Sequence, residues 1–214
     1  MEFKVHRFPN PGFLTYELTE HQMNFLWKRV EKSKSSKKVN EKLAGNISES
    51  FDMGLDGLEP MYEMLIPLCD EYEKQFGRPY FEHISGKATY TLELSDWWVN
   101  YQYQNEFNPL HNHSGIYSWV IWMKIPTEFK DQSKLPIAFN SSSKDNISNF
   151  NFTFPNSLGE IVDYKIEMGK ATEGTLAFFP SQLKHAVYPF YNCDEPRISI
   201  AGNISLFSKH LDKE

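Results

Sequence analysis

The sequence has little of several features that would assign it to a class at once. It has only two cysteines, Cys69 and Cys193, and they show neither a metal-ligand spacing nor the pattern of a disulfide framework. No apolar run is long enough to span a bilayer, and the N-terminal MEFKVHRFPN lacks the apolar core of a signal peptide. These absences predict a reduced, cytoplasmic protein with no membrane partner.

The sequence also lacks an excess of basic residues over acidic ones. The 28 acidic side chains outnumber the 22 basic ones, which gives a net charge of −6 at pH 7. Binding to nucleic acid needs a basic face that neutralises phosphates, so this balance argues against a nucleic-acid partner. The remaining composition, with 40% hydrophobic and 23% charged residues, is ordinary for a folded domain of 214 residues.

Hydrophobic periodicity divides the chain at about residue 86. Before it, apolar residues recur at helical spacing, which predicts one helix that starts after Thr19 and a second from about Leu58 to Gln75. Pro67 is expected to kink or split the second helix, and Gly77 to end it. We therefore expect an N-terminal helical support region at 1–86 and a β-rich core at 87–214, together forming one structural unit.

From residue 87 the period becomes two, which is typical of strands. We predict nine of them, at 87–94, 97–104, 116–125, 135–139, 149–154, 160–167, 174–179, 185–190 and 196–207. Many short strands without helices between them favour a sandwich, a jelly roll or a barrel. The last strand has a polar face with Arg197, Ser199, Ala201 and Asn203 opposite an isoleucine face, as expected if the polar face points into a barrel mouth.

Three histidines form a candidate metal site. His111 and His113 stand two residues apart in NPLHNHSG, so an extended backbone would place both imidazoles on one face, within reach of one ion. His185 lies in GTLAFFPSQLKHAVYP, where a predicted strand ends and the next begins. Each histidine alone is as easily a surface or packing residue. Together they can form a facial set of ligands that leaves coordination positions open.

Arg197 and Ser199 form a candidate anion site on the last predicted strand. A guanidinium fork beside a hydroxyl suits a carboxylate, and an arginine that points into a barrel needs an anionic partner. A dicarboxylate that chelates the metal at one end and meets Arg197 at the other would supply it; an ion pair within the chain is the alternative. Asn100 and Gln102 are further candidate polar contacts, unless they are solvent-facing strand residues.

The order of these motifs resembles the 2-oxoglutarate/Fe(II)-dependent oxygenases over about residues 97 to 207. It is most similar to a subgroup of marine bacteria and their phages that carries W-x-N ahead of N-P-x-H-x-H. The residues that carry this likeness here are Trp98, Asn100, Asn108, Pro109, His111 and His113, followed by the GTLAFFPS segment with His185 and by EPRISIAGN. For a phage protein, the compartment would be the host cytoplasm.

The resemblance implies a mainly β, double-stranded β-helix (a cupin-like jelly roll) with N-terminal supporting helices. It also implies Fe(II) bound by His111 and His185, and 2-oxoglutarate held by Arg197 and Ser199. The expected reaction hydroxylates a C–H bond of a small-molecule or peptide substrate and releases succinate and CO2. One residue departs from the family pattern, because His113 stands where the family has a carboxylate. We favour His113 as the third iron ligand, with a two-histidine site as the alternative.

Two other functions are open from the residues alone. A cupin-like dioxygenase with three histidines and no 2-oxoglutarate would use the same metal site, but it has no need for an arginine in the cavity. A non-enzymatic jelly-roll binding module would fit the high aromatic content of 15%, but it gives the histidines and Arg197 no common purpose. Neither the substrate nor the oligomeric state is predicted.

Overall fold

A computed structural model describes residues 4, 11–78, 89–140 and 146–209. The predicted strand 87–94 therefore begins outside the described residues. The strands are β1 (Leu14–Glu17), β2 (Glu49–Asp52), β3 (Thr89–Gln102), β4 (Asn108–His111), β5 (Tyr117–Lys124), β6 (Asn149–Pro155), β7 (Ile161–Glu167), β8 (Thr175–Pro180), β9 (Lys184–Val187) and β10 (Arg197–Lys209). The helices are α1 (Glu20–Ser33), α2 (Glu59–Phe76) and α3 (Phe129–Gln132), with short 3₁₀ turns at Asn40–Lys42, Pro136–Asn140 and Lys170–Thr172.

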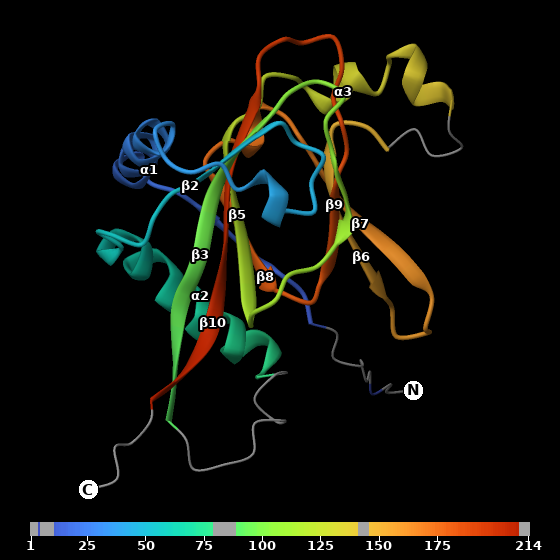
Figure 1. The fold of residues 1–214 in the computed structure, drawn as a ribbon. Helices are drawn as coiled ribbons and strands as arrows, with labels where there is room; N and C mark the ends of the chain where they lie inside the picture. Colours follow the sequence, from blue (N-terminus) through green and yellow to red (C-terminus); the bar gives the residue numbers. More distant parts are fainter. Residues whose placement is uncertain (1–3, 5–10, 79–88, 141–145, 210–214) are drawn as a thin grey trace, which may run out of the picture.

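Two antiparallel sheets face each other (Figure 1). The major sheet has the strand order β1-β8-β5-β10-β3-β2, and the minor sheet has the order β4-β9-β6-β7. From β3 onward, successive strands alternate between the sheets, as in a double-stranded β-helix, except that β6 and β7 form a hairpin within the minor sheet. The predicted fold class, a mainly β jelly roll with supporting helices, is confirmed.

Strand alternation separates two hydrophobic cores. Along β5, Trp119 and Ile121 point toward the helices, whereas Val120 and Trp122 point toward the minor sheet. The larger core packs α1 and α2 against the outer face of the major sheet, and the smaller core fills part of the space between the sheets. Because both faces of the major sheet are covered, β5 and β8 are apolar on both sides.

The two predicted helices are present nearly as expected. Thr19 caps α1 and forms a capping box with Gln22, which satisfies backbone N–H groups that the first turn leaves free. Pro67 lies inside α2, but the helix runs through it without a break. The proline is on the exposed face, so water can replace the hydrogen bond that its missing N–H cannot make. Gly77 ends α2 with a φ of 79°.

Three strand predictions need correction. Segment 135–139 is not a strand: Pro136–Asn140 forms a 3₁₀ turn, in which Ala138 donates its N–H to the Leu135 carbonyl. The predicted strands 87–94 and 97–104 form one strand, β3, whose pairing with β10 shifts near Ser95. Finally, three short strands were not predicted: β4 of the minor sheet, and β1 and β2 of the major sheet. β1 and β2 add edges to the major sheet from a region in which the periodicity indicated only helices.

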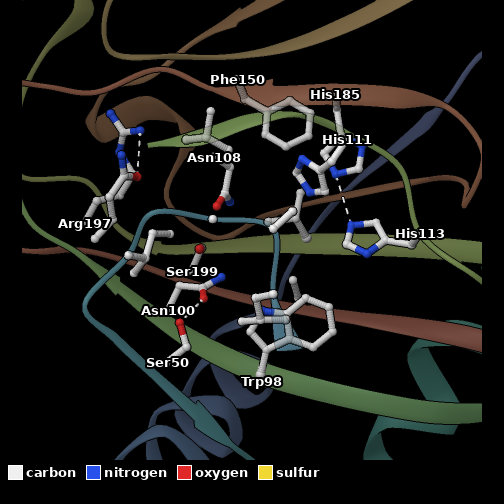
Figure 2. Close-up of a pocket in the computed structure, with 18 of the residues that line it drawn as sticks. Ser50, Trp98, Asn100, Asn108, His111, His113, Phe150, His185, Arg197 and Ser199 are labelled. Atoms are coloured by element: carbon white, nitrogen blue, oxygen red, sulfur yellow. Dashed lines mark hydrogen bonds between the residues drawn. The ribbon is translucent and has the colours of Figure 1, made fainter. Parts of the chain in front are cut away.

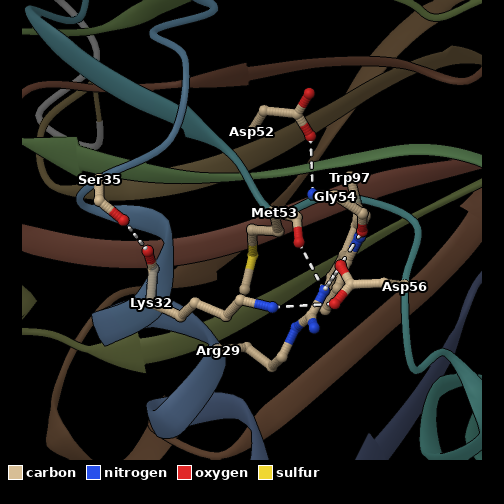
Figure 3. Close-up of polar contacts among 8 residues, drawn as sticks. All are labelled: Arg29, Lys32, Ser35, Asp52, Met53, Gly54, Asp56 and Trp97. Atoms are coloured by element: carbon tan, nitrogen blue, oxygen red, sulfur yellow. Dashed lines mark hydrogen bonds and ion pairs between the residues drawn. The ribbon is translucent and has the colours of Figure 1, made fainter.

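A buried arginine joins the N-terminal part to the sheet (Figure 3). Arg29 of α1 donates to the Met53 carbonyl at 2.5 Å, and its guanidinium lies 5.1 Å from the ring centroid of Trp97 on β3. The Trp97 indole N–H donates to the Gly54 carbonyl, and Asp56 is 3.5 Å from the guanidinium. These contacts fix the segment after β2 against β3. They thereby hold β2 in the position from which it contributes to the cavity described below.

Candidate metal centre

The three predicted histidines lie together at one end of the space between the sheets (Figure 2). His111 ends β4 and His185 lies in β9, where the two residues are direct partners in the strand pairing. His113 follows β4, and its backbone is hydrogen bonded in both directions to the β8–β9 turn, at Ser181 and Gln182. One ring nitrogen from each histidine lies within 4.8 Å of the others. Two segments that are far apart in sequence thus form a single cluster.

The hydrogen bonds of two of these rings fix their tautomers. Nδ1 of His111 lies 2.7 Å from the Pro109 carbonyl oxygen, and Nδ1 of His185 lies 2.9 Å from the Leu183 carbonyl oxygen. A carbonyl can only accept, so each Nδ1 carries the proton and each Nε2 presents a lone pair. This arrangement is typical of metal-ligating histidines, whose second nitrogen is held by an outer partner.

Burial keeps all three imidazoles neutral. It lowers the pKa of His113 to about 4 and that of His185 to about 3, with a further lowering from His111 in both cases. The pKa of His111 is also lowered by burial. Nε2 of His113 and Nε2 of His185 are 3.2 Å apart, close to the separation of about 3 Å expected for two neighbouring nitrogen ligands on one ion. Three neutral donors in this arrangement fit a divalent metal.

A cavity extends from the histidines to Arg197 at its far end (Figure 2), with about 750 Å³ of empty space that includes its part open to solvent. Arg197 is 2% exposed, and burial lowers the pKa of its guanidinium, which still remains protonated at neutral pH. It donates to Ser148 Oγ at 3.0 Å and to Gln102 Oε1 at 3.3 Å, but its Nε has no hydrogen-bond partner. No carboxylate among the described residues forms an ion pair with it, so this buried cation fits an anionic ligand.

Polar residues line the cavity between these two ends. β3 and β10 pair so that Asn100 is opposite Ser199 and Gln102 is opposite Arg197, and all four side chains border the cavity. Asn100 is 6% exposed, and its Oδ1 accepts a hydrogen bond from Ser50 Oγ at 2.7 Å. This bond leaves the amide N–H₂ of Asn100 free to face the cavity. Gln102 uses its amide N–H₂ on the Glu106 carbonyl and its oxygen on Arg197, so it orients the guanidinium.

Trp119 and Trp122, which also line the cavity, have different surroundings. Trp119 packs on the helix side of the major sheet, 6.4 Å from Trp97 between ring centroids, and it contributes only part of the cavity wall. Trp122 faces the minor sheet and meets the Phe150 ring edge-on at 5.7 Å. Both are almost fully buried, so core packing is their main role.

One part of the cavity wall was not predicted from the sequence. Segment 40–47 contributes Leu43, Ala44, Gly45 and Ile47, and β2 contributes Ser50. The Asn40 side chain holds this segment in place, because its N–H₂ donates to the Ile47 carbonyl and its Oδ1 accepts from the Ser50 N–H. The segment NEKLAGNI has neither an apolar period nor a motif, so its sequence gave no signal of this role. Only the pairing of β2 with β3 brings it to the site.

Comparison with known proteins identifies the family. Residues 96–203, about half of the chain, match the model of the family described as Putative 2OG-Fe(II) oxygenase. The chain belongs to this family. It is a 2OG-Fe(II) oxygenase, whose metal is Fe(II) and whose cosubstrate is 2-oxoglutarate, as predicted. The predicted alternatives, a cupin-like dioxygenase without 2-oxoglutarate and a non-enzymatic module, find no support in this match.

Solved structures show the same fold at low sequence identity. A prolyl-4-hydroxylase from Pseudomonas putida superposes with a TM-score of 0.51 at 13% identity, over 91% of this chain and 92% of that one. The non-heme alpha ketoglutarate dependent epimerase SnoN from nogalamycin biosynthesis has a TM-score of 0.54 at 11% identity, over 92% and 78%. AviO1 from Streptomyces viridochromogenes has a TM-score of 0.51 at 11% identity, over 97% and 94%. No curated protein matched the sequence.

Two further observations concern the prediction of no membrane partner and the remaining histidines. No helix among the described residues combines the length and the apolar character needed to cross a bilayer. His21 is exposed, whereas His6, His83 and His210 lie outside the described residues. His111, His113 and His185 therefore form the one cluster of potential metal ligands in the described part of the chain.

Proposed function

We propose that this oxygenase hydroxylates a C–H bond of a small-molecule substrate, with Fe(II) held by His111, His113 and His185. In the balanced reaction, one atom of O2 enters the succinate formed from 2-oxoglutarate and the other enters the new hydroxyl group, and CO2 is released. The cosubstrate and the C–H bond each supply two of the four electrons that O2 accepts. Bound iron supplies the oxygen activation, and the chain binds, orients and shields the reactants.

The buried, unpaired guanidinium of Arg197 is the observation that carries this proposal. In this proposal, Arg197 and Ser199 bind the distal carboxylate of 2-oxoglutarate. The carboxylate then accepts a hydrogen bond from the Arg197 Nε–H, which otherwise has no partner. Gln102 acts through Arg197, whose orientation it fixes. Asn100 donates its free amide N–H₂ to the cosubstrate at mid-cavity, and Ser50 holds that amide in the required orientation. The cavity that joins the histidines to Arg197 is where this ligand would lie.

The role of His113 decides the charge of the centre. With three neutral imidazoles, the charge of Fe(II) is balanced by the 2-oxoglutarate dianion alone, so the complex is one unit more positive than with a carboxylate ligand. The 3.2 Å approach of His113 Nε2 to His185 Nε2 supports a ligand role for His113. We therefore expect tight cosubstrate binding at this site.

An anaerobic titration with Fe(II) and 2-oxoglutarate tests the proposal. The chelated complex has a weak visible charge-transfer band, and we expect this band in the wild-type protein at one equivalent of iron. Exposure to O2 should then yield one succinate for each 2-oxoglutarate consumed. His185→Ala is expected to lower the affinity for iron at least 100-fold, because it removes one of three ligands.

The matched control is His21→Ala, since His21 is an exposed histidine of α1 outside the cluster. It should retain the band, the iron stoichiometry and succinate formation. If His185→Ala bound iron as tightly as the His21→Ala control, the assignment of the centre would be wrong. A His113→Ala variant that kept full iron affinity would leave a two-histidine site.

A further inference from the structure

A second cleft adjoins the candidate metal centre on the side away from Arg197. It contains about 910 Å³ of empty space, part of it open to solvent, and shares His111, His113 and Trp98 with the cosubstrate cavity. Segment 40–47 borders both spaces through Leu43 and Ala44. His111, at the end of β4, and His113, just after it, thus lie between the two spaces and separate an inner cavity from an outer cleft. A clefted space of this size, next to the reactive centre, fits a small organic molecule.

Strand register places two carboxylates in this cleft. The inward face of β3 carries Gln102, Asn100, Trp98 and Asp96 in that order, because alternate residues of a strand share a face. Asp52 of β2 is the direct partner of Trp98 in the strand pairing, so it lies on the same face. The face is therefore cationic at the Arg197 end and anionic at the Asp96 end, with the histidines above its middle. Both aspartates line the outer cleft and are exposed to solvent.

The charges of the cleft are not balanced by the chain. Asp96 accepts a hydrogen bond from the Asn203 amide at 2.6 Å, and Asp52 accepts one from the Gly54 N–H at 2.8 Å. Neither carboxylate takes part in an ion pair among the described residues. Lys42 is the single basic residue that lines the cleft in the described part of the chain, against two acidic ones. Although the Asp96 side chain reaches solvent, its pKa is raised, chiefly by the partial burial of its carboxylate and also by the charge of Asp52; the Asn203 hydrogen bond and Lys42 act in the opposite direction.

An aromatic wall completes this arrangement. Trp98 lines the cleft from the inward face of β3, and its ring lies 5.9 Å from the His113 ring between centroids. Carboxylates combined with an indole face are the groups that recognise an organic cation, through charge-assisted hydrogen bonds and cation–π contact. An anionic substrate would meet both aspartates and gain only Lys42.

We propose that the substrate of this oxygenase is a small organic cation, a primary amine or a guanidine, which binds in the outer cleft with its charged group between Asp52 and Asp96. The inference rests on the proposed function, because the substrate then lies beside the histidines that hold the iron. Its charged end is held at the aspartates, and its hydrocarbon part extends along Trp98 toward His111 and His113. Recognition of charge and positioning of the C–H bond are thus assigned to opposite ends of one cleft.

Isosteric probe pairs test this inference. n-Butylguanidine is compared with n-butylurea, and n-pentylamine with 1-pentanol, by calorimetry on the protein loaded with Zn(II) and 2-oxoglutarate. We expect each cation to bind at least about tenfold more tightly than its neutral partner, as a charge-assisted contact provides. Asp52→Asn and Asp96→Asn should each reduce this preference about threefold or more, and the double variant should abolish it. Lys42→Gln should strengthen cation binding a few-fold.

The substitutions to asparagine keep the size of the side chain and an oxygen acceptor, so the fold should be retained; thermal unfolding checks this. Asp163→Asn, at an exposed aspartate of β7 in the minor sheet, is the matched control and should leave the preference unchanged. Equal binding of the cationic and neutral probes, or a preference that survives in the double variant, overturns the inference.

The two proposals fail separately. Absence of the Fe(II)–2-oxoglutarate band and of succinate counts against the proposed function. The cation preference is measured by binding alone and can be repeated on the metal-free protein. A preference that depends on the aspartates, found without succinate formation, would retain the cleft as a cation site and overturn its role as the substrate site of this oxygenase.

Discussion

Replacement of Arg197 by methionine is expected to stabilise the fold in the absence of 2-oxoglutarate. The guanidinium is buried at 2% exposure with no anionic partner among the described residues, and a buried unpaired ion costs several kcal/mol. Methionine has a similar length and no charge. It can keep a contact with the Phe190 ring, which lies 5.1 Å below the guanidinium carbon in the wild type.

The losses are smaller than this gain. Gln102 Oε1 loses its donor, which costs about 1–3 kcal/mol for a buried acceptor. Ser148 Oγ also loses a donor, but it lies 3.4 Å from Thr127 Oγ1 and can keep that hydrogen bond. We therefore expect Arg197→Met to raise the free energy of unfolding of the apo protein by about 1–3 kcal/mol. For a chain of this size, each kcal/mol corresponds to about 2–4 °C in Tm.

Urea unfolding of the apo protein, followed by thermal unfolding with Zn(II) and 2-oxoglutarate, checks both parts. At a ligand concentration of 100 Kd the wild type should gain about 2.7 kcal/mol, and Arg197→Met should gain nothing at the same concentration. The matched control is Arg29→Met. That arginine is buried but bonded to the Met53 carbonyl and near Asp56, so its loss should destabilise the protein by about 2–4 kcal/mol. Loss of more than 2 kcal/mol in apo Arg197→Met, with an intact response to 2-oxoglutarate, would refute the reasoning.

Three further predictions concern the site and its support. The pKa of His185 is lowered to about 3, so the unfolded chain takes up a proton at this histidine at a higher pH than the folded protein does. The apo protein should therefore lose stability as the pH falls below about 6.5, and the free energy of unfolding from urea titrations should fall by up to about 1.4 kcal/mol per pH unit for this group. Bound Zn(II) should reduce this slope at mildly acidic pH. Gly202→Ala should cost about 2–3 kcal/mol, because its Cβ would lie 2.5 Å from Trp119 Cζ2, and equilibrium unfolding measures the loss. Ser50→Ala should weaken 2-oxoglutarate binding about threefold to tenfold by releasing the Asn100 amide, without a change in iron affinity; an unchanged Kd would exclude a positioning role for Ser50.

The long elements of the fold could be predicted because their signals are local. Thr19 and the apolar spacing after it define α1, and the apolar run rich in aromatic and β-branched residues in GIYSWVIWMKI defines β5. β1 and β2 were missed because four residues are too few to show a period, and their pairing partners are far along the chain. Segment 135–139 was misread because Pro136 favours a turn that the apolar pattern did not reveal.

The candidate site was predicted to the extent that its residues have distinctive chemistry. The structure brings His111, His113 and His185 together and places Arg197 at the end of the same cavity. Their roles as ligands to iron and 2-oxoglutarate stay predictions. Ser50 and segment 40–47 could not be found, because a serine or a loop gains its role only through the partner that the fold gives it. The acidic end of the face was missed for the same reason, since Asp52 and Asp96 are 44 positions apart in the numbering.

The central place of β10 in the major sheet has a consequence for the synthesis of the protein. β10 comes last among the described strands but pairs on one side with β3 and on the other with β5. A ribosome must therefore deliver residues 197–209 before the earlier strands can close into one sheet. Until then β3 and β5 each present an unpaired edge, which is the kind of surface that chaperones protect. Arg197, the proposed partner of the cosubstrate carboxylate, arrives with this same strand, so the nascent chain gains its sheet and its proposed anion site in a single late step.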